Sequence, residues 1–118
     1  QKVGIRNEGG RIIIPAYLSA GDIRNAVHFD NNSGNFFLKL RPDSKPAVKA
    51  VFLEEGKYIL SAESSNTLSA YVSLQSGIEG SGGRGNLPLV FKALRGTHVI
   101  ELFVKEDTDL REVVIEKR

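Results

Sequence analysis

The 118-residue sequence contains no cysteine, no methionine and no tryptophan. The absence of cysteine excludes disulfide frameworks, zinc ribbons, iron–sulfur clusters and thiol catalysis. Because even residue 1 is not methionine, we expect the chain to be processed or excised from a longer protein. No apolar run approaches the ~20 residues that a helix needs to span a bilayer, so we expect no membrane insertion.

Blocks of like charge are also absent. The 16 basic and 14 acidic side chains are interspersed along the chain and leave a net charge of +2. Proteins that bind duplex nucleic acid usually concentrate Lys and Arg on one face. We therefore expect no nucleic-acid partner.

The residues that are present have the composition of an ordinary globular domain, with 41% apolar and 25% charged residues. The length is typical of one domain and too short for two. We therefore expect residues 1–118 to form a single domain with an apolar core that needs no metal or disulfide for its stability.

Apolar side chains recur at every second position over most of the sequence, as in Ala70, Val72 and Leu74. This period is typical of strands with one buried face. A short helix or turn is expected only at residues 21–23. The expected strands are 11–14, 25–29, 36–40, 48–53, 58–63, 68–74, 87–91, 97–104 and 111–115. Eight or nine short strands separated by turn residues predict an all-β fold, an antiparallel β-sandwich.

Three spaced motifs in the second half carry a family resemblance. They are Gly56-Lys57-Tyr58, the Gly-x-x-x-Ile-x-Leu pattern of 96–102, and the Leu-x-x-Val-x-Ile pattern of 110–115. In this order they resemble the jelly-roll carbohydrate-binding modules, of the family 6 and family 35 type, that are attached to glycoside hydrolases. The resemblance covers about residues 48–116, with a looser fit from residue 24, and it implies a sandwich of jelly-roll type.

The resemblance also implies a function. The expected protein is a non-catalytic accessory module of a secreted, periplasmic or cell-surface bacterial glycan-active protein. Its partners would be a polysaccharide or oligosaccharide and a neighbouring catalytic domain. The absence of tryptophan favours an alternative, a structural or protein-interaction β-sandwich with no sugar ligand. A third hypothesis, a small β-barrel enzyme or lipocalin-like binder, requires a lined cavity for which the sequence shows no constellation of residues.

The candidate ligand-binding residues are Tyr71, Arg84 and Asn86, and Tyr17 is a fourth, less favoured candidate. A sugar ring stacks its C–H groups on an aromatic ring and needs hydrogen-bonding groups around that ring. Tyr71 lies opposite in phase to Ala70 and Val72, so we expect it to point outward. Arg84 and Asn86 would then bind hydroxyls or a uronic-acid carboxylate.

The modules that the sequence resembles commonly hold a structural calcium ion near their first and last strands. Glu8, Asp107 and Asp109 are the carboxylates that would hold it here, and the alternative is that the domain has no cofactor. The segment 30–35 is rich in oxygen donors, but Asn, Ser and Gly are also the standard residues of a turn, which is the interpretation we favour.

No motif predicts catalysis. Ser81 lies in the glycine-rich segment 77–86, which lacks the nucleophile elbow of serine hydrolases and the lysine of a P-loop. We interpret this segment as a flexible hairpin connection, the alternative being a mobile binding loop. His28 and His98 are interpreted as strand side chains at a sheet surface, since neither is paired with another potential metal ligand at a suitable spacing.

Overall fold

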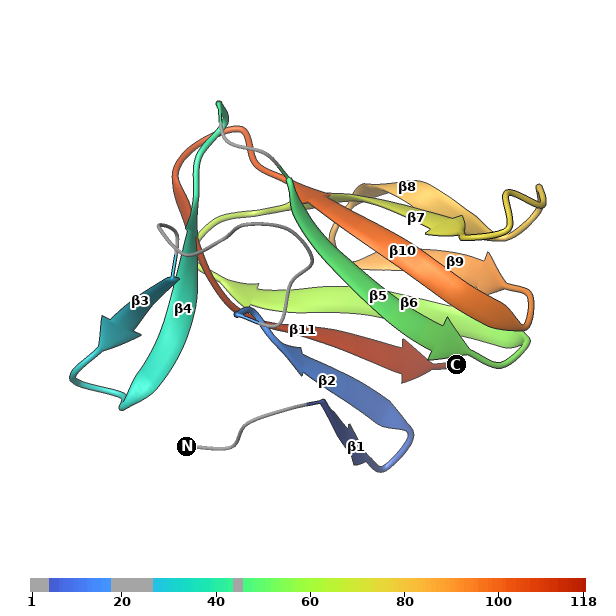
Figure 1. Cartoon of the computed structure of the whole chain (residues 1–118), viewed down its shortest axis with the longest axis horizontal. Coiled ribbons are helices and arrows are strands. Elements are labelled where there is room, and N and C mark those ends of the chain that lie inside the picture. Colours follow the sequence, from blue (N-terminus) through green and yellow to red (C-terminus); the bar gives the residue numbers. More distant parts are fainter. Residues whose placement is uncertain (1–4, 18–26, 44–45) are drawn as a thin grey trace.

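A computed structural model of the chain describes residues 5–17, 27–43 and 46–118. All regular structure in these residues is β-strand, and every strand pair is antiparallel (Figure 1). The strands are β1 (Arg6–Glu8), β2 (Arg11–Pro15), β3 (Val27–Asp30), β4 (Asn35–Leu40), β5 (Ala47–Leu53), β6 (Gly56–Ser64), β7 (Ser69–Leu74), β8 (Gly82–Asn86), β9 (Leu89–Ala93), β10 (Gly96–Phe103) and β11 (Thr108–Lys117).

Hydrogen bonds connect the strands into one sheet that curls into a half-barrel. The main path runs β1-β2-β11-β6-β9-β8-β7-β10-β5. Its two halves meet between β9 and β8, where the register contains a single residue pair, Gly82 and Lys92. The hairpin of β3 and β4 branches from the start of β11 and projects to one side of the curled body (Figure 1).

The inward-facing side chains of this curled sheet form the core. Strand β5 shows the alternation clearly, because Val51 and Leu53 are buried while Phe52 between them is half exposed. Strands β2, β4, β6, β7, β9, β10 and β11 contribute to the same apolar cluster. Burying each large aliphatic side chain favours folding by about 1.5–3 kcal/mol, which makes this alternation the main determinant of the fold.

A lysine also points into this core. Lys49 on β5 is 1% exposed, and its Nζ donates hydrogen bonds to the backbone carbonyls of Pro15 and Ala16 at the end of β2. Strands β5 and β2 lie near opposite ends of the hydrogen-bonded path. The lysine therefore bridges across the curl of the sheet.

The prediction of an all-β, antiparallel fold is confirmed. All nine expected strands are present, with small shifts at their ends, and the sequence-based estimate missed β1 and β8. The expected strand positions 25–26 and the expected turn at 21–23 lie outside the described residues. The hydrogen bonds join every strand into one sheet, so they do not by themselves separate the two layers of a jelly roll.

The interpretation of 77–86 as a flexible connection was wrong for its second half, since 82–86 is strand β8. Glycine is a poor strand former. Here, however, all five residues of β8 pair with β7, from Asn86 opposite Ser69 to Gly82 opposite Ser73. Pairing with the neighbouring strand thus outweighs the low local propensity. The described residues contain no helix long and apolar enough to cross a membrane.

Candidate functional site

Three of the predicted ligand-binding residues lie together on the outer face of the β7–β8 hairpin. The register places Tyr71 opposite Arg84 and Ser69 opposite Asn86. The guanidinium carbon of Arg84 lies 4.8 Å from the centre of the Tyr71 ring, and the Ser69 hydroxyl donates to Asn86 Oδ1 at 2.8 Å. Tyr71 is 37% exposed, so its ring is accessible from solvent.

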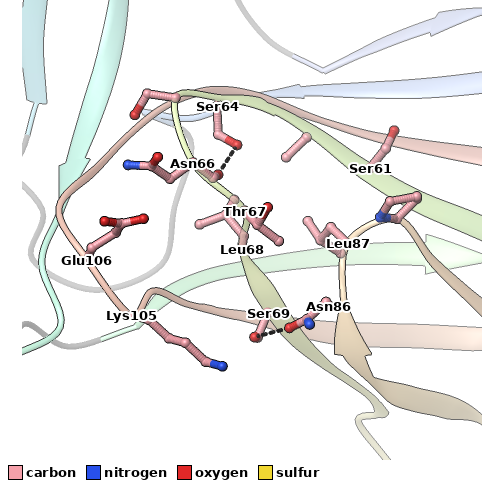
Figure 2. Close-up of a pocket in the computed structure, with 13 residues that line it drawn as sticks. Ser61, Ser64, Asn66, Thr67, Leu68, Ser69, Asn86, Leu87, Lys105 and Glu106 are labelled. Carbon is pink, nitrogen blue, oxygen red and sulfur yellow. Dashed lines mark hydrogen bonds between the residues drawn. The ribbon is translucent and has the colours of Figure 1, made fainter.

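A polar groove of about 720 Å³ opens beside this hairpin (Figure 2). Its walls come from the end of β6, the β6–β7 loop, the β8–β9 turn and the β10–β11 loop. Leu68, Leu87 and Pro88 supply its apolar part. Hydroxyl and amide side chains dominate its lining, namely Ser61, Ser64, Ser65, Asn66, Thr67, Ser69 and Asn86.

The groove walls are held by hydrogen bonds between the β6–β7 loop and the start of β11. Ser65 donates its backbone N–H to the Asp109 carbonyl at 3.0 Å, and its hydroxyl accepts the Asp109 N–H at 2.9 Å. Asn66 Nδ2 donates to the Asp107 carbonyl at 2.9 Å, and the Ser64 hydroxyl donates to the Asn66 carbonyl at 2.7 Å. These bonds preorganise the loop, which reduces the entropy that a ligand would have to remove.

The groove presents groups that suit a polyhydroxylated ligand. Lys105 and Glu106 lie at its edge with opposite charges and exposed side chains (Figure 2). Asn86 and Ser69 belong both to the groove and to the outer face that carries Tyr71 and Arg84. An extended ligand in the groove would therefore reach the aromatic ring without leaving the surface.

Tyr17, the fourth and less favoured candidate, does not lie beside the other three. It follows β2 and packs edge-on against Phe36 of β4, with ring centres 5.8 Å apart, in a separate cavity that Arg111 also lines. The structure therefore does not bring it together with Tyr71. The pairing of β2 with β11, which places Tyr17 beside the β3–β4 hairpin, is not visible in the local sequence pattern.

The three carboxylates expected to hold calcium are also separated. Glu8 pairs with Arg11, which pairs with Glu116 near the end of β11. Asp109 lies seven residues earlier on that strand, or roughly 20 Å away at about 3.3 Å per residue. Asp107 and Asp109 share a small pocket with basic residues, Lys39 and Arg41, which disfavour a cation.

The geometry therefore does not assemble the predicted calcium site. Among the described residues, no group of three or more His, Asp or Glu side chains has the arrangement of a metal site. The oxygen-rich segment 30–35 forms the turn between β3 and β4, in agreement with the interpretation of that segment as a turn.

A serine–histidine pair that the sequence pattern did not predict lies at the other end of β8. His98 is fully buried; its Nδ1 lies 3.0 Å from the Gly96 carbonyl, and its Nε2 lies 2.6 Å from the Ser81 hydroxyl. A carbonyl only accepts, so Nδ1 donates to Gly96, and in the tautomer with its proton on Nδ1 the Nε2 atom accepts from the Ser81 hydroxyl. Ser81 Oγ also accepts the Leu94 N–H at 2.9 Å.

Serine hydrogen-bonded to histidine is the arrangement of an activated nucleophile. Here, however, the serine oxygen already accepts a hydrogen bond from a backbone N–H, and the imidazole is fully buried. We therefore interpret the pair as a structural contact that holds the glycine-rich segment against the β9–β10 turn. His98 was correctly expected on a strand, but the expectation that it lies at the sheet surface was wrong. Its burial depends on pairing partners that are distant in the sequence.

Replacing Ser81 by Ala should destabilise the fold by about 2 kcal/mol. The substitution leaves the buried His98 Nε2 and the Leu94 N–H without their partner, and unsatisfied buried polar groups are costly. Urea unfolding measures the effect. Ser76→Ala is the matched control, because Ser76 is exposed in the preceding loop and should change stability by less than about 0.5 kcal/mol. Equal stability of the two variants would contradict a structural role for the contacts of Ser81 with His98 and Leu94.

Neither a family model nor a curated protein matches the sequence. The functional argument consequently starts from the geometry of the groove and the adjoining hairpin face. The sequence pattern did not predict most of the groove, since the run Ser64-Ser65-Asn66 lies between the expected strands 58–63 and 68–74 and was interpreted simply as a turn. The high density of hydroxyl and amide groups in this run was the one sequence feature that could have indicated a polar binding surface.

Proposed function

We propose that the protein is a non-catalytic carbohydrate-binding module that binds a polysaccharide or oligosaccharide along the groove and the outer face of β7 and β8. The observation that carries the proposal is that the groove and the outer face of β7 and β8 form one continuous surface. Asn86 and Ser69 line the groove and also flank the exposed ring of Tyr71. A glycan needs an aromatic platform next to many hydrogen-bonding groups, and this surface offers both.

The position of Arg84 refines this proposal. Its guanidinium lies over the Tyr71 ring, so a sugar that stacks on the same side of the ring must displace it. At an exposed site such a cation–π contact contributes only about 0.5–1 kcal/mol. The displaced guanidinium would then donate hydrogen bonds to hydroxyls or to a uronic-acid carboxylate.

The resemblance to jelly-roll modules of glycoside hydrolases supports the same proposal. The narrow join at Gly82 and Lys92 leaves two groups of strands, β1-β2-β11-β6-β9 and β8-β7-β10-β5, which is compatible with a sandwich of jelly-roll type. In this proposal the module belongs to a secreted, periplasmic or cell-surface bacterial protein, attached to a catalytic domain.

Isothermal titration with neutral and uronic-acid oligosaccharides from plant and animal glycans tests the function. We expect at least one ligand with a Kd below about 1 mM, and Tyr71→Ala should weaken it on the order of tenfold. Phe52→Ala is the matched control, because Phe52 is also an exposed aromatic with an arginine, Arg95, over its ring, yet it lies on edge strand β5 away from the groove. No binding across the panel at millimolar concentrations would defeat the proposal.

A protein-interaction module without a sugar ligand is the second candidate. Phe52 and Phe103 are 51% and 42% exposed on the same outer face as Tyr71. Phe52 pairs with Thr97 near the start of β10 and Phe103 ends that strand, so a protein partner that covered the length of this face would bury both rings. This candidate is favoured if no glycan binds and the protein self-associates as its concentration rises. Phe52→Ala should then abolish the self-association.

A further inference from the structure

A row of three basic residues crosses the outer face of β11, β6 and β9, which are neighbours in the sheet (Figure 1). Lys57 on β6 lies directly opposite Lys92 on β9, and their neighbours Tyr58 and Phe91 are buried in the core, so both lysines point outward. On the other side of Lys57, Arg118 follows β11 and donates its backbone N–H to the Lys57 carbonyl at 2.8 Å. Since neighbouring strands are about 4.8 Å apart, this basic row spans about 10 Å.

The charges of the basic row are exposed and uncompensated. In the part of the chain that the structure describes, Lys57, Lys92 and Arg118 form no ion pair, and the exposed Glu55 in the turn before β6 pairs with none of them. Like charges directly opposite one another on a sheet are destabilising, so an anionic ligand would relieve this repulsion. By contrast, four arginines each pair with a carboxylate, namely Arg6, Arg11, Arg95 and Arg111.

The same face of β6 leads from the basic row to the polar groove. Ile59 is two residues beyond Lys57, and it lies opposite Val90, whose side chain is 45% exposed. Ser61, two residues further along β6, lines the groove. Because residues two apart share a face of a strand, the basic row, an apolar step and the groove follow one another on one surface. Lys57 and Ser61 are about 13 Å apart at about 3.3 Å per residue.

We propose that the glycan-binding surface extends along β6 and β9 from the groove to the basic row, and that its ligand is an acidic polysaccharide with uronic-acid units. Hydroxyls of the ligand lie in the groove, and the C–H faces of its rings lie over Ile59 and Val90. A carboxylate accepts charge-assisted hydrogen bonds from the ammonium groups of Lys57 and Lys92. The inference rests on the proposed carbohydrate-binding function and adds the class of polysaccharide.

The residue types along this surface favour a polysaccharide over other anionic partners. Lysine is depleted at protein–protein interfaces, where arginine and aromatic residues are enriched. Proteins that bind single-stranded nucleic acid stack its bases on aromatic side chains, whereas Ile59 and Val90 are aliphatic. Segments that bind anionic membranes carry clusters of about four to eight basic residues, more than the basic row provides.

NMR titration of the ¹⁵N-labelled full chain tests the inference. The probes are oligogalacturonate, oligomannuronate and hyaluronan fragments, each alone, and a neutral oligosaccharide of the same length. At low salt at least one uronate should shift the amide signals of Lys57, Lys92 and Ser61 together, whereas the neutral oligosaccharide should leave those of Lys57 and Lys92 unchanged. Raising the salt concentration to about 150 mM should weaken the uronate binding, because salt screens exposed charges.

Removing the charges of the two lysines tests their role directly. Lys57→Gln/Lys92→Gln should weaken uronate binding about five- to tenfold, since exposed ion pairs are individually weak. Lys57→Arg/Lys92→Arg retains the charges and should retain the binding. Lys39→Gln/Arg41→Gln is the matched control, because it removes the same net charge from exposed residues at the end of β4, beside the start of β11 and away from the basic row.

A thermal unfolding measurement separates binding from folding. Lys57→Gln/Lys92→Gln removes two facing like charges, so without ligand it should unfold at the same or a higher temperature than the parent. The inference is overturned if no uronate shifts these amides at low salt, or if the glutamine variant keeps the parent affinity. Tighter binding of poly-glutamate or single-stranded DNA than of any uronate would also overturn it.

The inference and the proposed function fail separately. Neutral-glycan shifts at Ser69, Tyr71 and Asn86, with no uronate shift at Lys57 or Lys92, would retain the carbohydrate-binding function and reject the acidic ligand. Uronate shifts confined to the basic row would reject the continuous surface. Absence of shifts with every glycan would defeat both.

Discussion

Raising the pH from 7 to about 9.5 should stabilise the fold by several kcal/mol through Lys49. Burial lowers the pKa of Lys49 from 10.5 to about 7. Between these values the unfolded chain carries the proton and the folded chain has lost it, so the unfolded state binds more protons and the free energy of unfolding rises with pH. Below pH 7 both states are charged and the full cost of burying the ammonium applies; above 10.5 neither is charged.

Urea unfolding at a series of pH values measures this dependence, and Lys49→Met is the decisive variant. Methionine preserves an unbranched apolar stem but does not titrate, so its stability should stay nearly flat between pH 7 and 9.5. Tyr58 also contributes, because burial raises its pKa, so the free energy of unfolding falls when the unfolded tyrosine ionises near pH 10. Subtracting the curve of Lys49→Met from that of the parent removes this contribution, since both proteins contain Tyr58. If Lys49→Met keeps the slope of the parent, the lysine is not its source.

Gly82→Ala should be the most disruptive single-methyl substitution in the glycine-rich segment, costing more than about 3 kcal/mol. The φ of Gly82 is +97°, a region that residues with a Cβ rarely adopt, and an added Cβ would lie 2.0 Å from the Val72 carbonyl oxygen. That oxygen belongs to the backbone of β7, so it cannot move aside as a side chain could. Gly82 also forms the residue pair that joins β8 to β9.

The neighbouring glycine provides the matched control. An added Cβ at Gly83 would lie 3.5 Å from Phe91 Cβ, an ordinary van der Waals distance, and Gly83 does not have a positive φ. Gly83→Ala should therefore change the free energy of unfolding by less than about 1 kcal/mol. Urea denaturation of both variants measures the difference, and similar costs at the two positions would show that the clash at Gly82 is relieved by a small rearrangement.

Strand positions were predictable from the sequence because they depend on short-range alternation. Val72 and Leu74 point inward and Tyr71 outward, as the period of two predicts. The outward position of Tyr71 needed only the alternation, whereas its proximity to Arg84 and Asn86 depends on the pairing of β7 with β8. Strand β8 was missed because its glycines have low strand propensity, which its pairing with β7 outweighs.

The remaining features depend on which strands become neighbours. Tyr17, Arg6 and Arg111 come from both ends of the chain, and the pairing of β2 with β11 brings them to one cavity. Lys49 is in phase with the buried Val51 and Leu53, so the alternation places it on the inner face of β5. Only the curl of the sheet brings the carbonyls of Pro15 and Ala16 within reach of its Nζ.

By itself, the sequence determined an all-β chain of short antiparallel strands and, where the alternation is clear, as in β7, the face that is buried. It also determined the absence of cysteine chemistry. Only the tertiary structure decided the curl of the sheet, the polar groove, the separate cavity lined by Tyr17 and Arg111, and the carbonyl partners of Lys49. The physical reason is that alternation acts between neighbouring residues, whereas strand pairing and closure bring together residues far apart in the chain.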